Sequence, residues 1–257
     1  MAINIKTREE IAIMRDAGRV TAQALEAVRR AVRPGATTAE LDAVAEDWIR
    51  SHGAAPAFLN YPNPSYDNCP YPATITASIN DELVHGIPSR RRVLKEGDIL
   101  SVDCGCVYKG FVGDAAFTVG VGMVSSEAAR LIQVTEGALL KAIAASRVGN
   151  RLGDVSASVQ EFAASNGYQV VREYTGHGVG RRMHEDPQIP NWGTRGTGVP
   201  LRPGMTYALE PMLIAGDQAV YVKRDLWTVA TKDHSLCAHV EHTVAVTDGE
   251  AEILTLP

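Results

Sequence analysis

The sequence predicts an α+β protein built from two similar halves, because the order of its expected elements occurs twice. Two helical patterns followed by strand patterns occupy residues 7–121, and the same order returns over residues 125–250. The halves also contain similar motifs, since "HGIP" precedes "LKEGDILSVD" in the first half and "HGVG" precedes "LRPGMTYALE" in the second. In both, a Leu-x-x-Gly turn precedes a strand, and the sixth residue after the glycine is a carboxylate, Asp103 or Glu210. We therefore expect an internal duplication within a single domain that spans residues 1–257.

In the first half, two helices precede three strands. The first helix begins at the capping box of Thr7 and ends before Pro34, and the second begins at the capping box of Thr37 and ends before Gly53. A loop rich in proline, tyrosine and asparagine then leads to strands predicted at 74–79, 99–108 and 111–121. The last two strands form a hairpin with Lys109-Gly110 as its turn.

The second half repeats this order. Helical spacing of apolar residues predicts helices over 125–145 and 154–166, the second of them followed by Gly167. Strand-like stretches follow at 169–174, 206–213 and 239–246.

Composition excludes several classes of protein. The formal net charge of −5 gives the chain no general attraction for nucleic acids or anionic membranes. No apolar run of membrane-spanning length occurs, and the start "MAINIKTREE" lacks the apolar core of a signal peptide. The cysteines are too few and too scattered for a disulfide framework. We therefore expect a cytoplasmic protein. These cysteines are Cys69, Cys104, Cys106 and Cys237.

The predicted hairpin brings two acidic residues together. A two-residue turn pairs Gly105 with Asp114, and side chains alternate along a strand, so Asp103 and Asp114 share one face. Cys104 and Cys106 then point the other way, which favours small buried residues over a metal-binding CxC pair. Two aspartates on an otherwise apolar face would repel each other unless something neutralised them.

Two further acids, Glu210 and Glu241, lie in apolar strand contexts. A single buried acid of this kind is usually a satisfied structural residue. Four on predicted strands carry four negative charges, which two divalent cations would balance. Oxygen-rich ligation with one imidazole is typical of a two-metal hydrolytic centre that uses Mn, Fe, Co or Zn. His177 is the natural nitrogen ligand, because Gly176 and Gly178 allow its backbone a close approach.

Two more histidines could act on a substrate. A hydrolase also needs a donor for the developing oxyanion and a group that assists the departing nitrogen. His85 and His184 occupy corresponding loops of the two halves, which suits them to this work. A structural or surface histidine is the simpler alternative at both positions.

At these residues the sequence closely resembles the type I methionine aminopeptidases, over nearly the whole chain. The resemblance implies the pita-bread fold, in which two pseudo-twofold halves surround a central antiparallel sheet. It also implies five ligands for two divalent ions, Asp103, Asp114, His177, Glu210 and Glu241. Asp114 and Glu241 would bridge both ions. The motifs that carry the resemblance are "SINDELVHGIP", "VDCGCVYKGFVGDAAFT", "GHGVGRRMHEDPQIPNW", "LEPM" and "WTVATKDHSLCAHVEHTVAVT".

The resemblance further implies an activity, which is removal of the initiator methionine from new chains whose second residue is small. Metal-activated hydroxide would attack the carbonyl, Glu210 would move a proton, and His184 would bind the scissile amide. The methionine pocket would have His85 at its rim. Its walls would be Tyr71, Thr76, Met183 and Trp227, although many bacterial relatives carry cysteine at position 76 and an aromatic residue at position 183.

Two alternative functions remain open from the sequence. A prolidase or proline aminopeptidase uses the same ligands, but such enzymes normally carry an additional N-terminal domain. A metal-free peptide-binding relative would be expected to have lost ligands, and none is lost.

A short basic run suggests a partner. We expect the protein to act as a monomer on nascent polypeptide N-termini. The run is a candidate ribosome contact, although a solvated loop is the simpler reading. It comprises Arg90, Arg91, Arg92 and Lys95.

Overall fold

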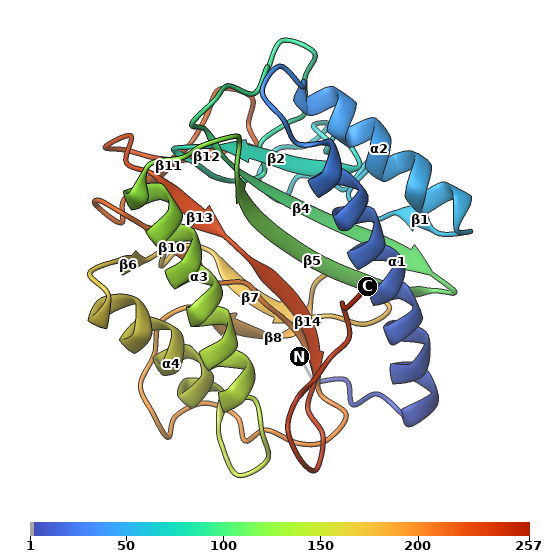
Figure 1. Ribbon diagram of the computed structural model, residues 1–257. Coiled ribbons are helices and arrows are strands. Elements are labelled where there is room, and N and C mark those ends of the chain that lie inside the picture. The colour runs from blue at the N-terminus through green and yellow to red at the C-terminus, as the bar shows by residue number, and fades with distance from the viewer. Residues whose placement is uncertain (1–2) are drawn as a thin grey trace.

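The computed structural model describes residues 3–257. Its centre is a nine-stranded sheet in which every pair of neighbouring strands is antiparallel (Figure 1). Along the sheet the order is β1 (Ala55–Pro56), β4 (Ile99–Tyr108), β5 (Phe111–Gly120), β14 (Glu241–Ala245), β9 (Thr206–Leu209), β7 (Thr175–Gly178) and β8 (Glu185–Pro190). Strand β2 (Ile75–Ile79) also pairs with β4, and β15 (Glu252–Ile253) with β14.

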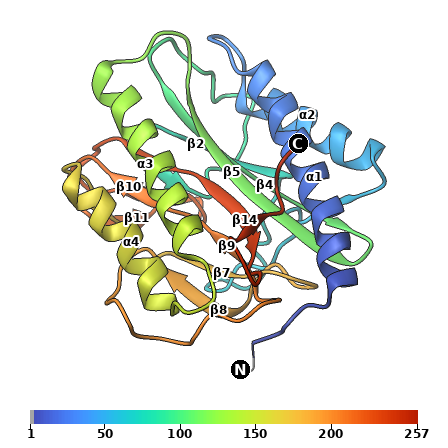
Figure 2. The same cartoon turned by 60° about the horizontal axis from the view of Figure 1, so that its bottom comes forward.

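Four helices cover one face of this sheet (Figures 1 and 2). They are α1 (Arg8–Ala31), α2 (Thr38–Ser51), α3 (Ser126–Ala145) and α4 (Leu152–Ser165). The predicted capping boxes at Thr7 and Thr37 begin the first two helices, and Ser125 caps the third. The fourth helix begins two residues before the predicted start, because the Asp154 carboxylate accepts a hydrogen bond from the Arg151 N–H and so caps an earlier turn.

The four helices pack on one face of the large sheet, so the polar side chains of a functional site can lie on the other face. Alternate β4 residues, Cys104 and Cys106 among them, join the apolar cluster beneath α1 and α2. On the other side of the sheet's midline, Tyr207, Leu209 and Val244 join the cluster beneath α3 and α4. The side chains in between must point to the opposite face.

Two three-stranded sheets flank the large sheet, and the first of them also packs beneath α3 and α4 through Val170, Leu213 and Ala238. One is ordered β13 (Cys237–His239), β10 (Met212–Ile214) and β6 (Gln169–Val170), and the other is ordered β11 (Val220–Val222), β12 (Val229–Thr231) and β3 (Glu82–Val84). Their apolar side chains meet in one cluster that includes Leu83, Met212 and Val229. The carbonyl and N–H of His239 both bond to the Thr118 hydroxyl on β5, which fixes β13 against the large sheet.

The predicted hairpin is confirmed, since Gly105 pairs with Asp114 and Tyr108 with Phe111. The turn residues Lys109 and Gly110 have φ of 48° and 78°, and positive φ at both central residues is what a two-residue type I′ turn requires.

The strands predicted at 206–213 and 239–246 are wrong in one respect, because each is broken in two, and of the run predicted at 169–174 only Gln169–Val170 forms a strand. The first part of the 206–213 run, β9, lies in the large sheet, and the second part, β10, lies in a small one. The change of sheet falls at Glu210 and Pro211, and proline cannot continue a ladder because it lacks an N–H. In the 239–246 run, the change from β13 to β14 falls at Val240.

Candidate metal centre and adjoining pocket

Strand register places three of the four predicted acids side by side on the open face of the large sheet. Asp103 on β4 and Glu241 on β14 are both opposite Ala116 on β5. Asp114 lies two residues from Ala116, so it points to the same face. Opposite residues of neighbouring strands also share a face, and the three carboxylates therefore converge.

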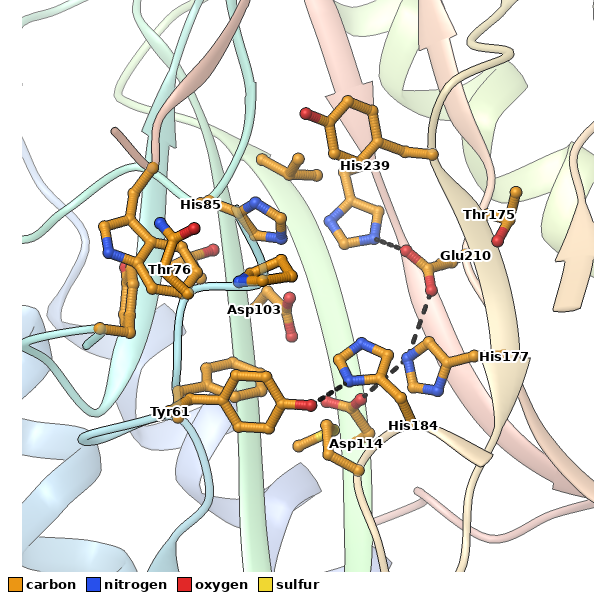
Figure 3. A pocket seen from close by; sticks show the side chains of 18 of the residues that line it. Tyr61, Thr76, His85, Asp103, Asp114, Thr175, His177, His184, Glu210 and His239 are labelled. Carbon is orange, nitrogen blue, oxygen red and sulfur yellow. Dashed lines mark hydrogen bonds and ion pairs between the residues drawn. The ribbon is translucent and has the colours of Figure 1, made fainter. Parts of the chain in front are cut away.

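The remaining two candidates reach this face from the other half of the chain. His177 on β7 is opposite Ala208, which is opposite Thr243, two residues beyond Glu241. Glu210 directly follows β9, where Leu209 pairs with His242, so it lies beside Glu241. Figure 3 shows Asp103, Asp114, His177 and Glu210 around one space. The structure thus brings together all five residues that the sequence singled out.

The distances suit a shared cation. His177 Nε2 lies 3.5 Å from Glu210 Oε1 and 3.7 Å from Asp114 Oδ2, which is beyond hydrogen-bond length but short enough for atoms around one ion. One ligand atom each from Asp114, His177 and Glu241 lie within 4.8 Å of one another. The Nδ1 of His177 faces the Gly178 carbonyl oxygen at 3.0 Å. When Nδ1–H donates there, Nε2 presents its lone pair to the acids, as in most metal-binding histidines.

Electrostatics indicate that the carboxylates need a counter-charge. Burial, followed by repulsion from Asp114, raises the pKa of Asp103, and the pKa values of Glu210 and Glu241 rise for the same kinds of reason. Among the residues that line this cavity in the described chain, none is lysine or arginine. Three buried carboxylate oxygens have no hydrogen-bond partner, Asp103 Oδ1, Asp114 Oδ1 and Glu241 Oε1. This donor set fits hard or borderline divalent cations.

The two substrate candidates, His85 and His184, lie next to this cluster (Figure 3). The ring of His184 is centred 4.2 Å from that of His177, and its Nδ1 is 2.6 Å from the hydroxyl of Tyr61. His85 packs edge-on against the rings of Tyr174 and Trp227. Burial lowers the pKa of His85 to about 4, so its imidazole is neutral near pH 7.

The cluster lines a cavity of about 260 Å³, and all four predicted wall residues line the apolar part of it. Tyr71 donates its hydroxyl to the carbonyl oxygens of Ile75 and Gly86, and Trp227 Nε1 donates to that of Cys69. Two walls are therefore held by hydrogen bonds, whereas buried Met183 is held by packing alone. The four predicted wall residues are Tyr71, Thr76, Met183 and Trp227.

Gly105 leaves space where the pocket meets the hairpin. A Cβ at this position would lie 2.7 Å from Met183 Cε and 3.2 Å from Asp114 Oδ1. Both approaches are closer than van der Waals contact, so the absence of a side chain lets the pocket wall and the acid come together.

Sequence reasoning missed two polar residues of this site, Tyr61 and His239. The Nε2 atom of His239 is buried and lies 3.8 Å from Glu210 Oε2 and 3.9 Å from Glu241 Oε2. Alternation along the strand predicted at 239–246 would already have put His239 on the face of Glu241. The position of Tyr61 in an irregular loop left no such signal.

The structure shows that the residues of the basic run at 90–95 differ in their surroundings. Arg92 forms an ion pair with the buried carboxylate of Glu82 and donates a hydrogen bond to the Ile87 carbonyl, so it is not free to bind a partner. Arg90, Arg91 and Lys95 are exposed.

Comparison with known proteins identifies the family. The model of metallopeptidase family M24 matches residues 12–248. The chain belongs to this family. It is 49% identical over 254 residues to a methionine aminopeptidase of Clostridium acetobutylicum and 44% identical over 250 residues to methionine aminopeptidase 1 of Bacillus subtilis. These matches cover 99% of both chains in the first case, and 97% of this chain and 98% of the relative in the second.

Solved structures support the same family and fold. The crystal structure of a methionine aminopeptidase from Thermotoga maritima has a TM-score of 0.95, 48% sequence identity and 100% coverage of both chains. A prolidase from Pyrococcus furiosus has a TM-score of 0.78 at 23% identity, and this chain covers 65% of it, so that likeness shows the shared fold alone. The predicted family and pita-bread fold are therefore confirmed.

Family membership and the cluster together support the use of divalent metal ions by this M24 chain. A membrane span finds no support, because the helices within residues 3–257 are too short or too polar to cross a bilayer.

Proposed function

We propose that this M24 peptidase removes the N-terminal methionine from newly made proteins, preferring chains whose second residue is small. One observation carries the proposal, namely that the carboxylate cluster and a set of apolar walls line the same cavity of about 260 Å³. The cavity is large enough for one unbranched apolar side chain, and the cluster lies where the following peptide bond would be. Methionine aminopeptidases from several bacteria, at 42–49% identity over nearly the full chain, support the same activity.

The proposed centre would hold two divalent ions through Asp103, Asp114, His177, Glu210 and Glu241. The four carboxylates among these residues would balance the charge of the pair. When bound, the metals polarise the scissile carbonyl and lower the pKa of a coordinated water. The donor set accepts Co, Mn, Fe or Zn.

The protein's own residues orient the substrate and handle protons. With Tyr61 as donor to Nδ1, His184 keeps its proton on Nε2 and can donate it to the developing oxyanion. Neutral His85 packs against Trp227 and lines the same cavity as the metal cluster, so it can contact the peptide next to the methionine side chain. Glu210, at the edge of the cluster, can take a proton from the attacking water and deliver it to the departing amine.

Met183 sets the character of the pocket. Its unbranched thioether can adopt several conformations, so this wall adjusts to the bound side chain more readily than a rigid aromatic ring would. Met183 and the proposed ligand Asp114 both lie next to Gly105, which ties the shape of the pocket to the metal centre.

The alternatives are less well supported. Solved prolidases and X-Pro aminopeptidases share only the fold, at 21–23% identity, and this chain covers 62–65% of their length. A metal-free binding protein would have no use for four converging buried carboxylates.

Hydrolysis of Met-Ala-Ser, Met-Lys-Ser and Ala-Pro by the metal-loaded enzyme tests the proposal. We expect rapid release of methionine from the first peptide, slow release from the second, and no cleavage of the third. Preferential cleavage of Ala-Pro would favour the proline-directed alternative, and no cleavage of any peptide would favour the binding protein.

We further propose that the protein works as a cytoplasmic monomer and approaches the ribosome through Arg90, Arg91 and Lys95. Binding through exposed charges should weaken steeply as salt concentration rises. Charge reversal of Arg90 and Arg91 should reduce co-sedimentation with ribosomes, while peptide hydrolysis stays unchanged. Undiminished co-sedimentation would show that this surface is only a solvated loop.

A further inference from the structure

His239 is a buried residue of the site with no role in the reaction described above. It is the last residue of β13, and its side chain is 2% exposed. Its backbone N–H donates to the Thr118 hydroxyl at 3.0 Å, and its carbonyl accepts from the same hydroxyl at 2.6 Å. Two bonds to one residue of β5 fix the backbone, so the ring has little freedom to turn away from the acids.

The ring nitrogen Nε2 faces two carboxylates without bonding to either. It lies 3.8 Å from Glu210 Oε2 and 3.9 Å from Glu241 Oε2, and it is buried without a partner. Both distances exceed a hydrogen bond by less than 1 Å. A small rotation of either side chain would therefore close the gap, and leaving the gap open costs the full desolvation of a polar group.

His177 and His239 differ in the hydrogen bonding of their Nδ1 atoms. His177 has a carbonyl acceptor for Nδ1–H, which frees Nε2 to bind a metal ion. Within residues 3–257, His239 makes hydrogen bonds through its backbone only, and of its two ring nitrogens it is Nε2 that is buried facing the carboxylates. The proton of His239 is thus best placed on Nε2, toward the carboxylate oxygens, and this makes the residue a hydrogen-bond donor rather than a ligand.

The two oxygens of Glu210 face different imidazoles (Figure 3). Oε1 lies 3.5 Å from His177 Nε2, on the side of the metal cluster, whereas Oε2 lies 3.8 Å from His239 Nε2. A donor at Oε2 would occupy that oxygen and direct Oε1 toward the ion that His177 binds.

We propose that His239 is a positioning residue, which holds Glu210 through an Nε2–H···Oε2 hydrogen bond so that only Oε1 binds metal. The inference rests on the proposed metal centre. Hydrogen-bond partners of metal ligands typically contribute 10–100-fold to metal affinity, and we expect an effect of this size.

The test compares His239→Leu, which removes the donor at similar volume, with His239→Gln, whose amide N–H can reach the same oxygen. The apparent Kd for Co²⁺ is measured by competition with a chromophoric chelator, on metal-free protein. We expect the Kd to rise about 10–100-fold in the leucine variant and to stay within about threefold of wild type in the glutamine variant. If the leucine variant does not fold, His239→Ala gives the same comparison.

Three outcomes would overturn the inference in distinguishable ways. Unchanged Co²⁺ affinity in the leucine or alanine variant would show that His239 only fills space. An equal loss in the glutamine variant would indicate that the imidazole itself binds metal. Failure of the wild-type protein to bind Co²⁺ would refute the metal centre and, with it, the proposed function.

Discussion

Replacing Lys6 with methionine should destabilise the protein by about 3 kcal/mol, because it leaves a buried carboxylate without its cation. Lys6 Nζ lies 2.6 Å from Glu185 Oε2, and the two side chains are only 6% and 3% exposed. Asn4 Nδ2 also donates to Oε2, and the backbone N–H groups of Arg181 and Arg182 donate to Oε1. The network fastens residues 4–6 to the loop that carries Met183 and His184.

The size of the effect follows from what remains after the substitution. Removing one partner of a buried ion pair typically costs about 3–5 kcal/mol. Three donors still reach Glu185, so we expect the lower end of that range. Although burial raises the pKa of Glu185, the hydrogen bonds from Lys6 and its neighbours outweigh it and the net shift is downward.

The pH dependence has a defined sign. A carboxylate with a lowered pKa stabilises the fold above its unfolded pKa of about 4.3, and this contribution is lost as pH falls through the folded pKa. The difference between wild type and the Lys6→Met variant should therefore be full near pH 7 and shrink below about pH 4.

Urea denaturation of the metal-free proteins measures the free energies of unfolding. A double-mutant cycle with Glu185→Gln should give a coupling above about 1 kcal/mol, because the neutral amide no longer needs the cation. Arg30→Met is the matched control. It breaks the exposed Arg30–Glu26 pair on α1 and should cost less than about 0.5 kcal/mol. Equal, small losses in both lysine and arginine variants would refute the reasoning.

Four further substitutions test the site. Asp114→Asn should lower both metal content and turnover, and full metal content with normal activity would exclude a bridging role. Alanine at His85 or His184 should lower kcat by about 10²-fold or more with metal content retained, so metal loss in either variant would contradict a role toward substrate. Met183→Phe should raise the ratio of kcat/KM for Met-Ala-Ser over Leu-Ala-Ser by stiffening the wall, with metal content unchanged. An unchanged ratio would remove Met183 from the pocket.

Local signals explain which parts of the fold could be predicted. Capping boxes and a two-residue turn act over four or five neighbouring residues, so Thr7, Thr37 and the turn at Lys109-Gly110 were correct from sequence. The register of the hairpin then placed Asp103 and Asp114 on one face without any knowledge of the remaining fold.

The breaks in the later strands depend on tertiary partners. The residues on both sides of Glu210 are apolar and buried, so the sequence pattern continues while the chain passes from the large sheet to a small one. Only the partners, β14 for β9 and β13 for β10, distinguish the two parts. Pro211 was the one local sign of a break.

The same limit applies to the site. The five proposed ligands stand out because buried acids in apolar strands are unusual. The hydrogen bond from Tyr61 to His184 joins an irregular loop to a distant turn, and the ion pair of Arg92 with Glu82 depends on the neighbouring sheet. Neither contact has a signature in sequence spacing.

The central claim is that converging carboxylates hold the metals that cleave N-terminal methionine. The most direct measurement is stepwise addition of Co²⁺ or Mn²⁺ to metal-free protein, with Met-Ala-Ser hydrolysis and bound metal followed together. We predict no hydrolysis without metal, and activity that rises with loading and is complete by two ions per chain. Hydrolysis by the metal-free protein, or metal binding that brings no activity, would contradict the account.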